Sequence, residues 1–201
     1  MSKDIKLKPH STDSEFFKLL EKRRSRRDFD GTKDLTEQEL SDLLWVAYGE
    51  TAPGNEQLGM VPHKCVPSAC AIYPLKIFVF LRKGIYVYDS KNNELKLVKE
   101  GDFREKTGTQ DFVKNASANL LFFFDHSAYE NHAYKDFLVT PVGMRMPSVD
   151  CRIIAQNICI FAALRGLKTV IRGATGDEKI LRELCGLNDK HELLLGQSIG
   201  H

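Results

Sequence analysis

The sequence has no long apolar run, no strong net charge and no signal-peptide pattern. Among its 201 residues, no segment approaches the roughly 18 apolar residues of a membrane span. The polar stretch 1–10 lacks the apolar centre of a secretion signal. The formal net charge is only +2, so bulk electrostatics would not hold this protein on a nucleic acid. We therefore expect neither a membrane nor a nucleic acid as a partner.

The common catalytic and metal-binding motifs are also missing. The sequence contains no GxxxxGKS/T phosphate loop, no dinucleotide-binding GxGxxG, no GxSxG nucleophile elbow and no HExxH zinc pair. It shows no evident pair of nucleophile and base either. A metal site is not expected. If the protein is an enzyme, a cofactor supplies its chemistry.

Cysteines are few, odd in number and without a CxxC spacing. Two of the five, Cys151 and Cys159, lie in an apolar helical pattern. Such cysteines are typical of reduced, mostly buried thiols. Because reduced thiols suit the cytoplasm, we expect a cytoplasmic protein.

The sequence predicts one α+β domain over residues 1–201, with residues 1–11 as a flexible polar arm. Its 42% hydrophobic and 28% charged residues are typical of a globular protein, and no linker or repeat divides it. S/T-x-x-E capping boxes at Thr12–Glu15 and Thr36–Glu39 predict two helix starts. We expect about five mostly antiparallel strands wrapped by helices. The segments of strand character are 75–81, 85–88, 95–98, 120–125, 168–171 and 193–199, and further helices are predicted within 103–114 and over 178–185.

Two further segments have unusual patterns. The stretch from Asp150 to Leu164 is apolar nearly all round, which predicts a long buried helix at the centre of a domain or of a dimer. Residues 126–148 carry few regular signals. A connection of that length indicates either a functional loop or a short helix, and the pattern favours neither.

Lys22 to Phe29 is the densest cluster of cations in the chain. The first capping box predicts a helix to about Arg24, and Phe16, Leu20, Arg23 and Arg27 fall on one stripe of it. That stripe would turn two arginines toward the protein, where they need an anion. Guanidinium groups with a serine hydroxyl suit a phosphate. A solvated helix end explains the cluster equally well, and a nucleic-acid patch is a third interpretation.

Three other segments could contact a ligand. Pro67-Ser68-Ala69 forms a rigid turn with little side-chain bulk, Arg172-Gly173 follows a strand, and Thr109-Gln110-Asp111 could bind a polar ring edge. Taken singly, each is explained as well or better by an ordinary structural turn.

The ordered set of these segments resembles the nitroreductase family of FMN-dependent oxidoreductases. The resemblance extends from about Phe16 to His201, and its hairpin is most similar to the branch of the SagB-type dehydrogenases. The residues that carry it are Arg23 to Phe29, Leu40 to Gly49, Pro67-Ser68-Ala69, Gly84 to Asp89, Gly101 to Arg104, Gln110 to Phe112, Asp150 to Gly166 and Ser198 to His201.

The resemblance implies a role for each candidate segment. The FMN phosphate and ribityl chain would be bound by Arg23, Arg24, Ser25 and Arg27. The turn Pro67, Ser68 and Ala69 would meet the flavin ring from the other subunit of a homodimer. Gln110 would face the pyrimidine edge, and the backbone of Arg172 and Gly173 would approach flavin N5.

Two features depart from the family pattern. Members often carry a further basic residue after the closing Gly-His, whereas this sequence ends at His201, so that contact is expected to be missing or replaced. Cys70 and Ile72 stand where polar residues are common, which predicts a less polar flavin pocket.

The implied activity is a ping-pong reaction. NADH or NADPH would donate hydride to flavin N5, and a nitroaromatic, a quinone or a similar small molecule would then accept the electrons. Two alternatives keep the flavin. One is a SagB-like dehydrogenase of a small molecule or peptide heterocycle, and the other is a flavin-binding protein without turnover.

Overall fold

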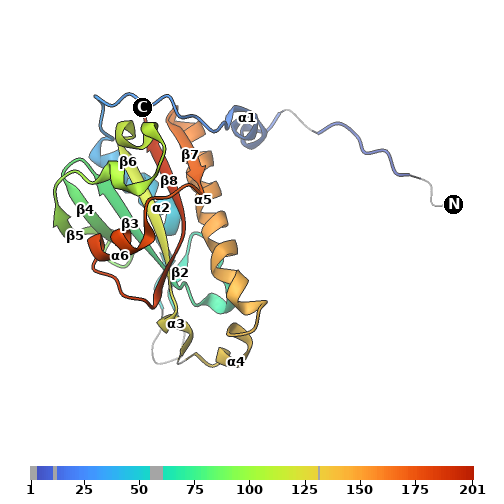
Figure 1. The fold of residues 1–201 in the computed structure, drawn as a ribbon. Coiled ribbons are helices and arrows are strands. Elements are labelled where there is room, and N and C mark those ends of the chain that lie inside the picture. Colours follow the sequence, from blue (N-terminus) through green and yellow to red (C-terminus); the bar gives the residue numbers. More distant parts are fainter. Residues whose placement is uncertain (1–3, 11–12, 55–60, 131) are drawn as a thin grey trace.

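The computed structural model describes residues 4–10, 13–54, 61–130 and 132–201. Its centre is a six-stranded sheet in the order β5-β4-β3-β6-β8-β7, in which every neighbouring pair is antiparallel (Figure 1). The strands are β3 Leu75–Leu81, β4 Gly84–Asp89, β5 Glu94–Glu100, β6 Ala118–Asp125, β7 Lys168–Arg172 and β8 His191–Gly200, and a separate small sheet pairs β1 Glu50–Ala52 with β2 His63–Lys64.

The sheet forms because its middle strand is apolar on both faces. In β6 every residue from Ala118 to Phe124 is buried, and the strand pairs with β3 on one side and β8 on the other. A strand buried on both faces reads as a continuous apolar run, which is why the sequence predicted it. The mostly antiparallel α+β fold is confirmed, although the main sheet has six strands rather than about five.

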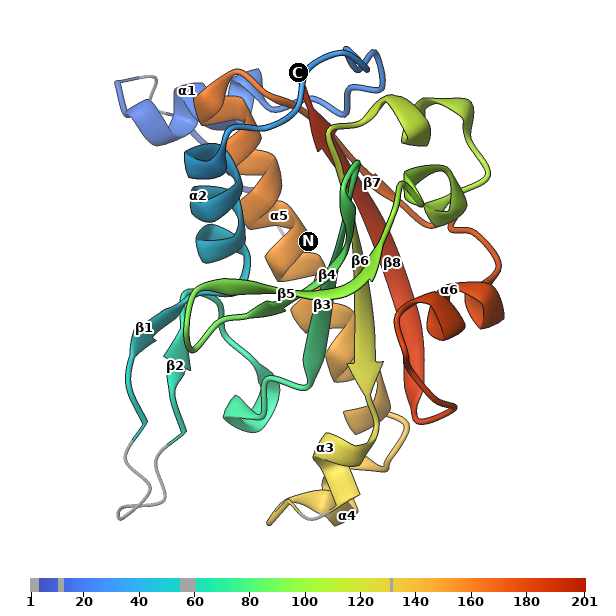
Figure 2. The same cartoon turned by 90° about the vertical axis from the view of Figure 1, so that its left-hand side faces the viewer.

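Helices cover both faces of the sheet, as Figure 2 shows. The helices α2 (Glu37–Tyr48) and α5 (Met146–Arg165) pack on one face, where they share a core with Leu120, Phe122 and Phe124. The opposite face carries α6 (Glu178–Leu184), whose Leu181 packs against Phe123 and its neighbours. Two short 3-10 turns, η3 (Arg104–Thr107) and η4 (Asp111–Asn115), replace the interrupted helix predicted over 103–114.

The long helix is present, but within one chain it is buried on one side. Cys151, Ile154 and Ile158 are fully buried against the sheet, whereas Val149 and Leu164 on the outer side are 49% and 62% exposed. The segment Gly143–Arg165 is long and apolar enough to cross a membrane, yet half of its most apolar stretch is already covered by protein. The outer side therefore remains available for a partner.

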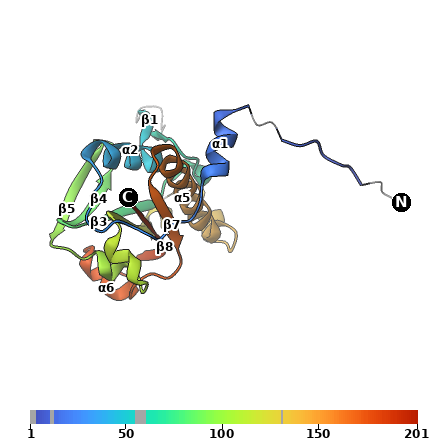
Figure 3. The ribbon, with the colours of Figure 1, turned by 90° about the horizontal axis from the view of Figure 1, so that it is seen from above.

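The first helix ends earlier than the sequence predicted. Helix α1 runs from Glu15 to Lys22 with Ser14 as its N-cap, and it buries no residue completely. The predicted cap Thr12 lies outside the described residues. Figure 3 shows α1 standing at the edge of the molecule beside α5. The second capping box is confirmed, since Thr36 and Glu39 bond each other's backbone N–H groups.

Segment 126–148 contains short helices. They are α3 (Ser127–Glu130), α4 (Lys135–Leu138) and the 3-10 turn η5 (Gly143–Arg145). A small 3-10 turn, η2 (Ala69–Ala71), follows Ser68.

Candidate functional site

The arginine cluster is an extended segment and not a helical stripe. After Lys22 the backbone leaves helical geometry at Arg23, and Ser25 forms a parallel bridge with Thr169 of β7. The N–H of Arg26 donates to the carbonyl of Thr169 at 2.9 Å. In extended backbone successive side chains point to opposite sides. The prediction that Arg23 and Arg27 continue a helix face was therefore wrong, although both still fall on one side, with Ser25 between them.

The other cations of the cluster lie around a cavity, and two of them are engaged by neighbouring protein groups. The cations Lys22, Arg24, Arg26 and Lys168 line a cavity of about 250 Å³ beside the end of α5. Arg26 and Lys168 both pair with Asp28, at 2.8 and 3.1 Å, and these contacts hold the pKa of Asp28 well below its usual range. The Arg24 guanidinium donates at 2.8 Å to the carbonyls of Glu21 and Arg23, so it stabilises its own backbone.

Arg23, Ser25 and Arg27 are the members of the cluster whose side chains remain available. In the described part of the chain no carboxylate pairs with either arginine, and the Ser25 hydroxyl has no hydrogen-bond partner. The Arg27 guanidinium lies over the ring of Phe112, 6.0 Å from its centroid. Two unpaired guanidinium groups flanking a hydroxyl are the donor set that an anion such as a phosphate requires.

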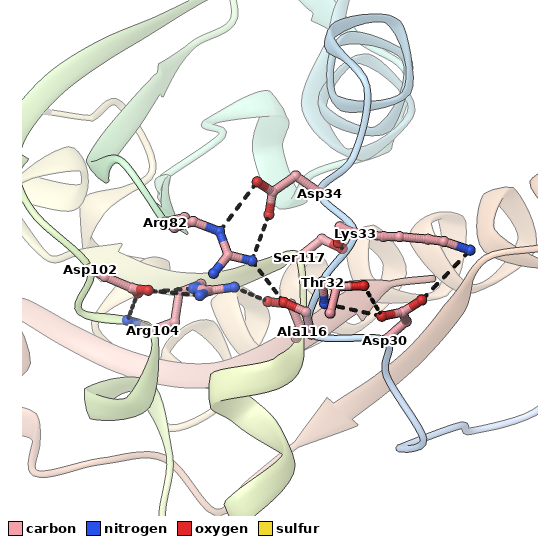
Figure 4. Close-up of polar contacts among 10 residues, drawn as sticks. Asp30, Thr32, Lys33, Asp34, Arg82, Asp102, Arg104, Ala116 and Ser117 are labelled. Carbon is pink, nitrogen blue, oxygen red and sulfur yellow. Dashed lines mark hydrogen bonds and ion pairs between the residues drawn. The ribbon is translucent and has the colours of Figure 1, made fainter.

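The chain that follows the arginines is fixed to the sheet, as Figure 4 shows. Arg82 donates to Asp34 at 3.2 Å and to the carbonyl of Gly31 at 2.8 Å. The Ser117 hydroxyl donates to the carbonyl of Lys33 at 2.7 Å, and buried Arg104 bonds Asp102 and the carbonyl of Ala116. The backbone that follows the arginine segment is thus anchored, which limits the entropy lost when the segment binds an anion.

At the other end of β7, Arg172 is buried. It is 3% exposed, and its guanidinium donates to the carbonyls of Thr107 and Ala174 and to the side chain of Asn119. Its Nε has no partner among the described residues, and desolvation lowers the pKa of Arg172 to about 10. The Arg172 side chain therefore anchors the turn that follows it from the protein interior.

Gly173 is exposed, and a side chain added there would meet nothing within 4 Å. Open space at this turn leaves the backbone accessible to a ligand. Gln110 is half-buried at the start of η4, and the contacts of Arg172 with Thr107 bring the Thr107–Gln110 loop beside the Gly173 turn. From Thr169 to Gly173 the chain spans about 13 Å at ~3.3 Å per residue. That span suits an extended ligand with an anionic end near Ser25.

The Pro67-Ser68-Ala69 turn lies elsewhere in the chain. Its Ser68 hydroxyl donates to Asp150 near the start of α5, whereas the cavity beside the arginines lies against Cys159 and Ala162. Positions 150 and 159 of a helix are about 13 Å apart at 1.5 Å per residue, and Figures 1 and 2 show the two regions at opposite ends of the molecule. Within one chain the structure does not bring this turn to the arginines.

The turn itself has an unusual backbone. Cys70, Ala71 and Tyr73 all have φ between 52° and 53°, the left-handed region that favours glycine. Each such residue costs about 1 kcal/mol or more. Its supporting residue, Asp150, was not recognised in the sequence as functional; the available signal was a carboxylate inside an otherwise apolar helix.

Comparisons with known proteins concern the chain as a whole rather than single site residues. The family model described as "Nitroreductase family" matches residues 20–201. A protein of Methanocaldococcus jannaschii that is named for the nitroreductases, MJ1384, is 31% identical over 187 residues, which cover 88% of this chain and 87% of that protein.

Two solved structures have the same fold. One, from Ralstonia eutropha JMP134 and also named for the nitroreductases, matches with a TM-score of 0.77 at 29% identity over 97% of this chain and 87% of its own. The NADPH:FMN oxidoreductase of Vibrio harveyi, solved in complex with NAD+, matches with a TM-score of 0.60 at 20% identity over 92% and 68%.

Proposed function

Because this chain belongs to the nitroreductase family, we propose that it is an FMN-dependent oxidoreductase. It takes hydride from NADH or NADPH and delivers electrons to a nitroaromatic, a quinone or a similar small acceptor, by a ping-pong sequence. The observation that carries the proposal is the unpaired set of Arg23, Ser25 and Arg27, which lies against the start of β7.

The extended segment binds the FMN phosphate. Arg23 and Arg27 supply charge-assisted hydrogen bonds and Ser25 supplies a hydroxyl donor. Arg24 belongs to the same segment, but its guanidinium is engaged by backbone carbonyls, so its share of phosphate binding is smaller. The Vibrio harveyi protein, which shares the fold, is named for FMN and NADPH, and this supports the same cofactor and donor here.

The opposite end of β7 orients the ring. The exposed backbone at Gly173, with Arg172 holding the turn from below, offers an N–H to flavin N5, and Gln110 contacts the pyrimidine edge. When bound, FMN accepts and donates the hydride equivalent, while the protein supplies orientation and a site that excludes water. No side chain of this chain is assigned as an acid or a base.

The site is completed by a second copy of the chain. The turn Pro67, Ser68 and Ala69 is remote from the arginines of its own chain, so the partner subunit provides it. An apolar groove of about 340 Å³ between α1, α2 and α5 supports a homodimer, because Phe16, Trp45 and Leu164 at its edges are 54%, 45% and 62% exposed. Exposed apolar surface of this kind is typical of an interface.

Replacing Leu164 with glutamate is expected to weaken the dimer, because a charge must then be buried in an apolar contact. The measurement is sedimentation velocity over a concentration series, with bound flavin per chain recorded alongside. Val139→Glu is the matched control, since Val139 is 64% exposed and lies outside the groove. Equal dissociation constants for the two variants would contradict an interface at this groove.

The visible spectrum of the purified protein tests the proposal as a whole. We expect flavin absorption bands near one FMN per chain, and NADH or NADPH oxidation that depends on menadione or a nitroaromatic. Bound flavin without turnover on any acceptor would favour a flavin-binding protein, and turnover only in the direction of substrate oxidation would favour the SagB-like dehydrogenase. Protein that binds no FMN even after reconstitution would refute the assignment.

A further inference from the structure

Helix α5 carries a buried carboxylate that has no counter-ion. Asp150 is 6% exposed, and in the described residues no lysine, arginine or histidine forms an ion pair with it. An unpaired buried charge is costly, so a protein keeps one only where its hydrogen bonds matter.

The bonds of Asp150 all go to one turn. Its Oδ2 accepts from the Ser68 hydroxyl at 2.6 Å, and the backbone N–H of Ala69 faces the carboxylate and lowers its pKa. The Ser68 oxygen in turn accepts from the N–H of Tyr73 at 3.0 Å. The carboxylate of α5 therefore holds the Ser68 hydroxyl, and the same hydroxyl holds the backbone of Tyr73. Both ends of the segment from Ser68 to Tyr73 are fixed in this way.

This turn needs such support. Three of its residues, Cys70, Ala71 and Tyr73, have left-handed backbone without being glycine. Strained conformations of this kind persist only where the surroundings hold them. Removing the Asp150–Ser68 bond leaves the turn free to relax.

We propose that Asp150 is a positioning residue for the flavin: through Ser68 it fixes the shape of the Pro67–Ala69 turn, and loss of its negative charge weakens FMN binding. The inference rests on the proposed function, in which this turn meets the flavin ring of the partner subunit. Asp150 does not touch the cofactor itself.

Because Asp150 can ionise, the proposal predicts a characteristic pH dependence of FMN affinity and of apoprotein stability. The titratable groups that face it are Tyr48 of α2, Tyr129 of α3 and Cys151 of α5, and because burial raises the pKa of each, all three are neutral. Burial raises the pKa of Asp150 above its ordinary value, while the Ser68 hydroxyl and the backbone N–H of Ala69 oppose that rise.

FMN affinity and the stability of the apoprotein then change in opposite directions as the pH falls through that raised pKa. Protonation weakens the hydrogen bond that Asp150 accepts from Ser68, so FMN affinity falls. A folded-state pKa above the unfolded value means that the folded chain binds the extra proton, so protonation of Asp150 increases the stability of the apoprotein. A purely structural role would move affinity and stability together.

The experiment titrates apoprotein with FMN by flavin fluorescence quenching between pH 5 and 9, for the wild type, Ser68→Ala, Asp150→Asn and the double variant. At pH 8 each single variant is expected to bind FMN about tenfold more weakly, the loss typical of one hydrogen bond to a charged group. The double variant should bind no more weakly than the worse single variant, and Asp150→Asn should lack the acid-side loss of affinity. Tyr129→Phe, beside Asp150 but not bonded to the turn, should bind like the wild type.

Thermal unfolding of each apoprotein separates positioning from folding. Asp150→Asn is expected to melt no lower than the wild type at pH 8, because it removes an unpaired buried charge. FMN binding by both single variants as tight as that of the wild type, additive losses in the double variant, or a loss of affinity that follows a lower melting temperature would each overturn the inference and leave the proposed function standing. A wild type that binds no FMN would overturn both.

Discussion

Replacing Arg23 and Arg27 together by alanine is expected to weaken FMN binding by about two to four orders of magnitude while the chain stays folded. Each charge-assisted hydrogen bond to the phosphate contributes about 1.5–3 kcal/mol, and two such losses correspond to a factor of ~10² to 10⁴ in the dissociation constant. The fold should persist because neither guanidinium forms an ion pair within the described chain. The measurement is FMN fluorescence quenching, with circular dichroism to verify folding.

The control for this variant removes the same charge from the same segment. Lys22→Ala with Arg26→Ala takes away two cations that line the cavity beside α5, Lys22 from the end of α1 and Arg26 from the extended backbone. Arg26 is already paired with Asp28, so we expect FMN affinity to change by less than about fivefold, through the long-range field alone. Equal losses in the two double variants would mean that the cluster acts only through its net charge.

The fold was predictable where local pattern and tertiary packing agree. The capping box of Thr36 and Glu39 and the apolar run of β6 each determine one element almost alone, and the structure confirms both. The end of α1 was not predictable from its own residues. Lys22 ends the helix because Ser25 and Arg26 pair with Thr169 of β7, far along the chain, and this tertiary pairing overrides the helical spacing of Arg23 and Arg27.

The candidate site was likewise predictable from the sequence only in part. The residue types at positions 23 to 27 indicated an anion, but which of them are available became clear only from the pairing of Arg26 and Lys168 with Asp28. The bond from Ser68 to Asp150 joins residues 82 positions apart, so no spacing rule could have found it. The remote position of the Pro67 turn likewise depends on the length of α5. Long-range contacts therefore determine which predicted residues can act together.

Substitution of the buried Arg172 is expected to have the second large effect. Its guanidinium reaches the carbonyls of Thr107 and Ala174 at 2.9 and 3.2 Å, where it joins η3 to the turn after β7. Two glycines make room for it, since a Cβ at Gly108 would lie 2.2 Å from Nη1 and one at Gly196 would lie 3.0 Å from Nη2. No carboxylate contacts the guanidinium in the described residues, so the neutral carbonyl, amide and hydroxyl oxygens around it compensate its desolvation.

Arg172→Met is expected to lower the free energy of unfolding by about 3 kcal/mol and to weaken FMN binding as the Gly173 turn loses its anchor. Methionine fills much of the space, but it leaves the buried carbonyl of Thr107 and the partly buried carbonyl of Ala174 without these donors. An unpaired buried group costs ~1–3 kcal/mol, and only the removed charge offsets this. At this chain length the loss corresponds to a fall in melting temperature of about 6–12 °C. Chemical denaturation measures the first effect and FMN titration the second.

Two further substitutions distinguish the hydrogen-bond network from the charge. Arg172→Lys keeps a cation with fewer donors and without the planar fork, so its loss should be intermediate. Arg165→Met removes a half-exposed arginine that approaches Asp42 only at 3.8 Å, and it should change stability by less than about 0.5 kcal/mol. If Arg172→Met proved as stable as the wild type, the free energy that the hydrogen bonds of the guanidinium contribute to folding would only balance the cost of its desolvation. In that case the turn at Gly173 would depend on its own backbone for its position, and FMN affinity should survive the substitution as well.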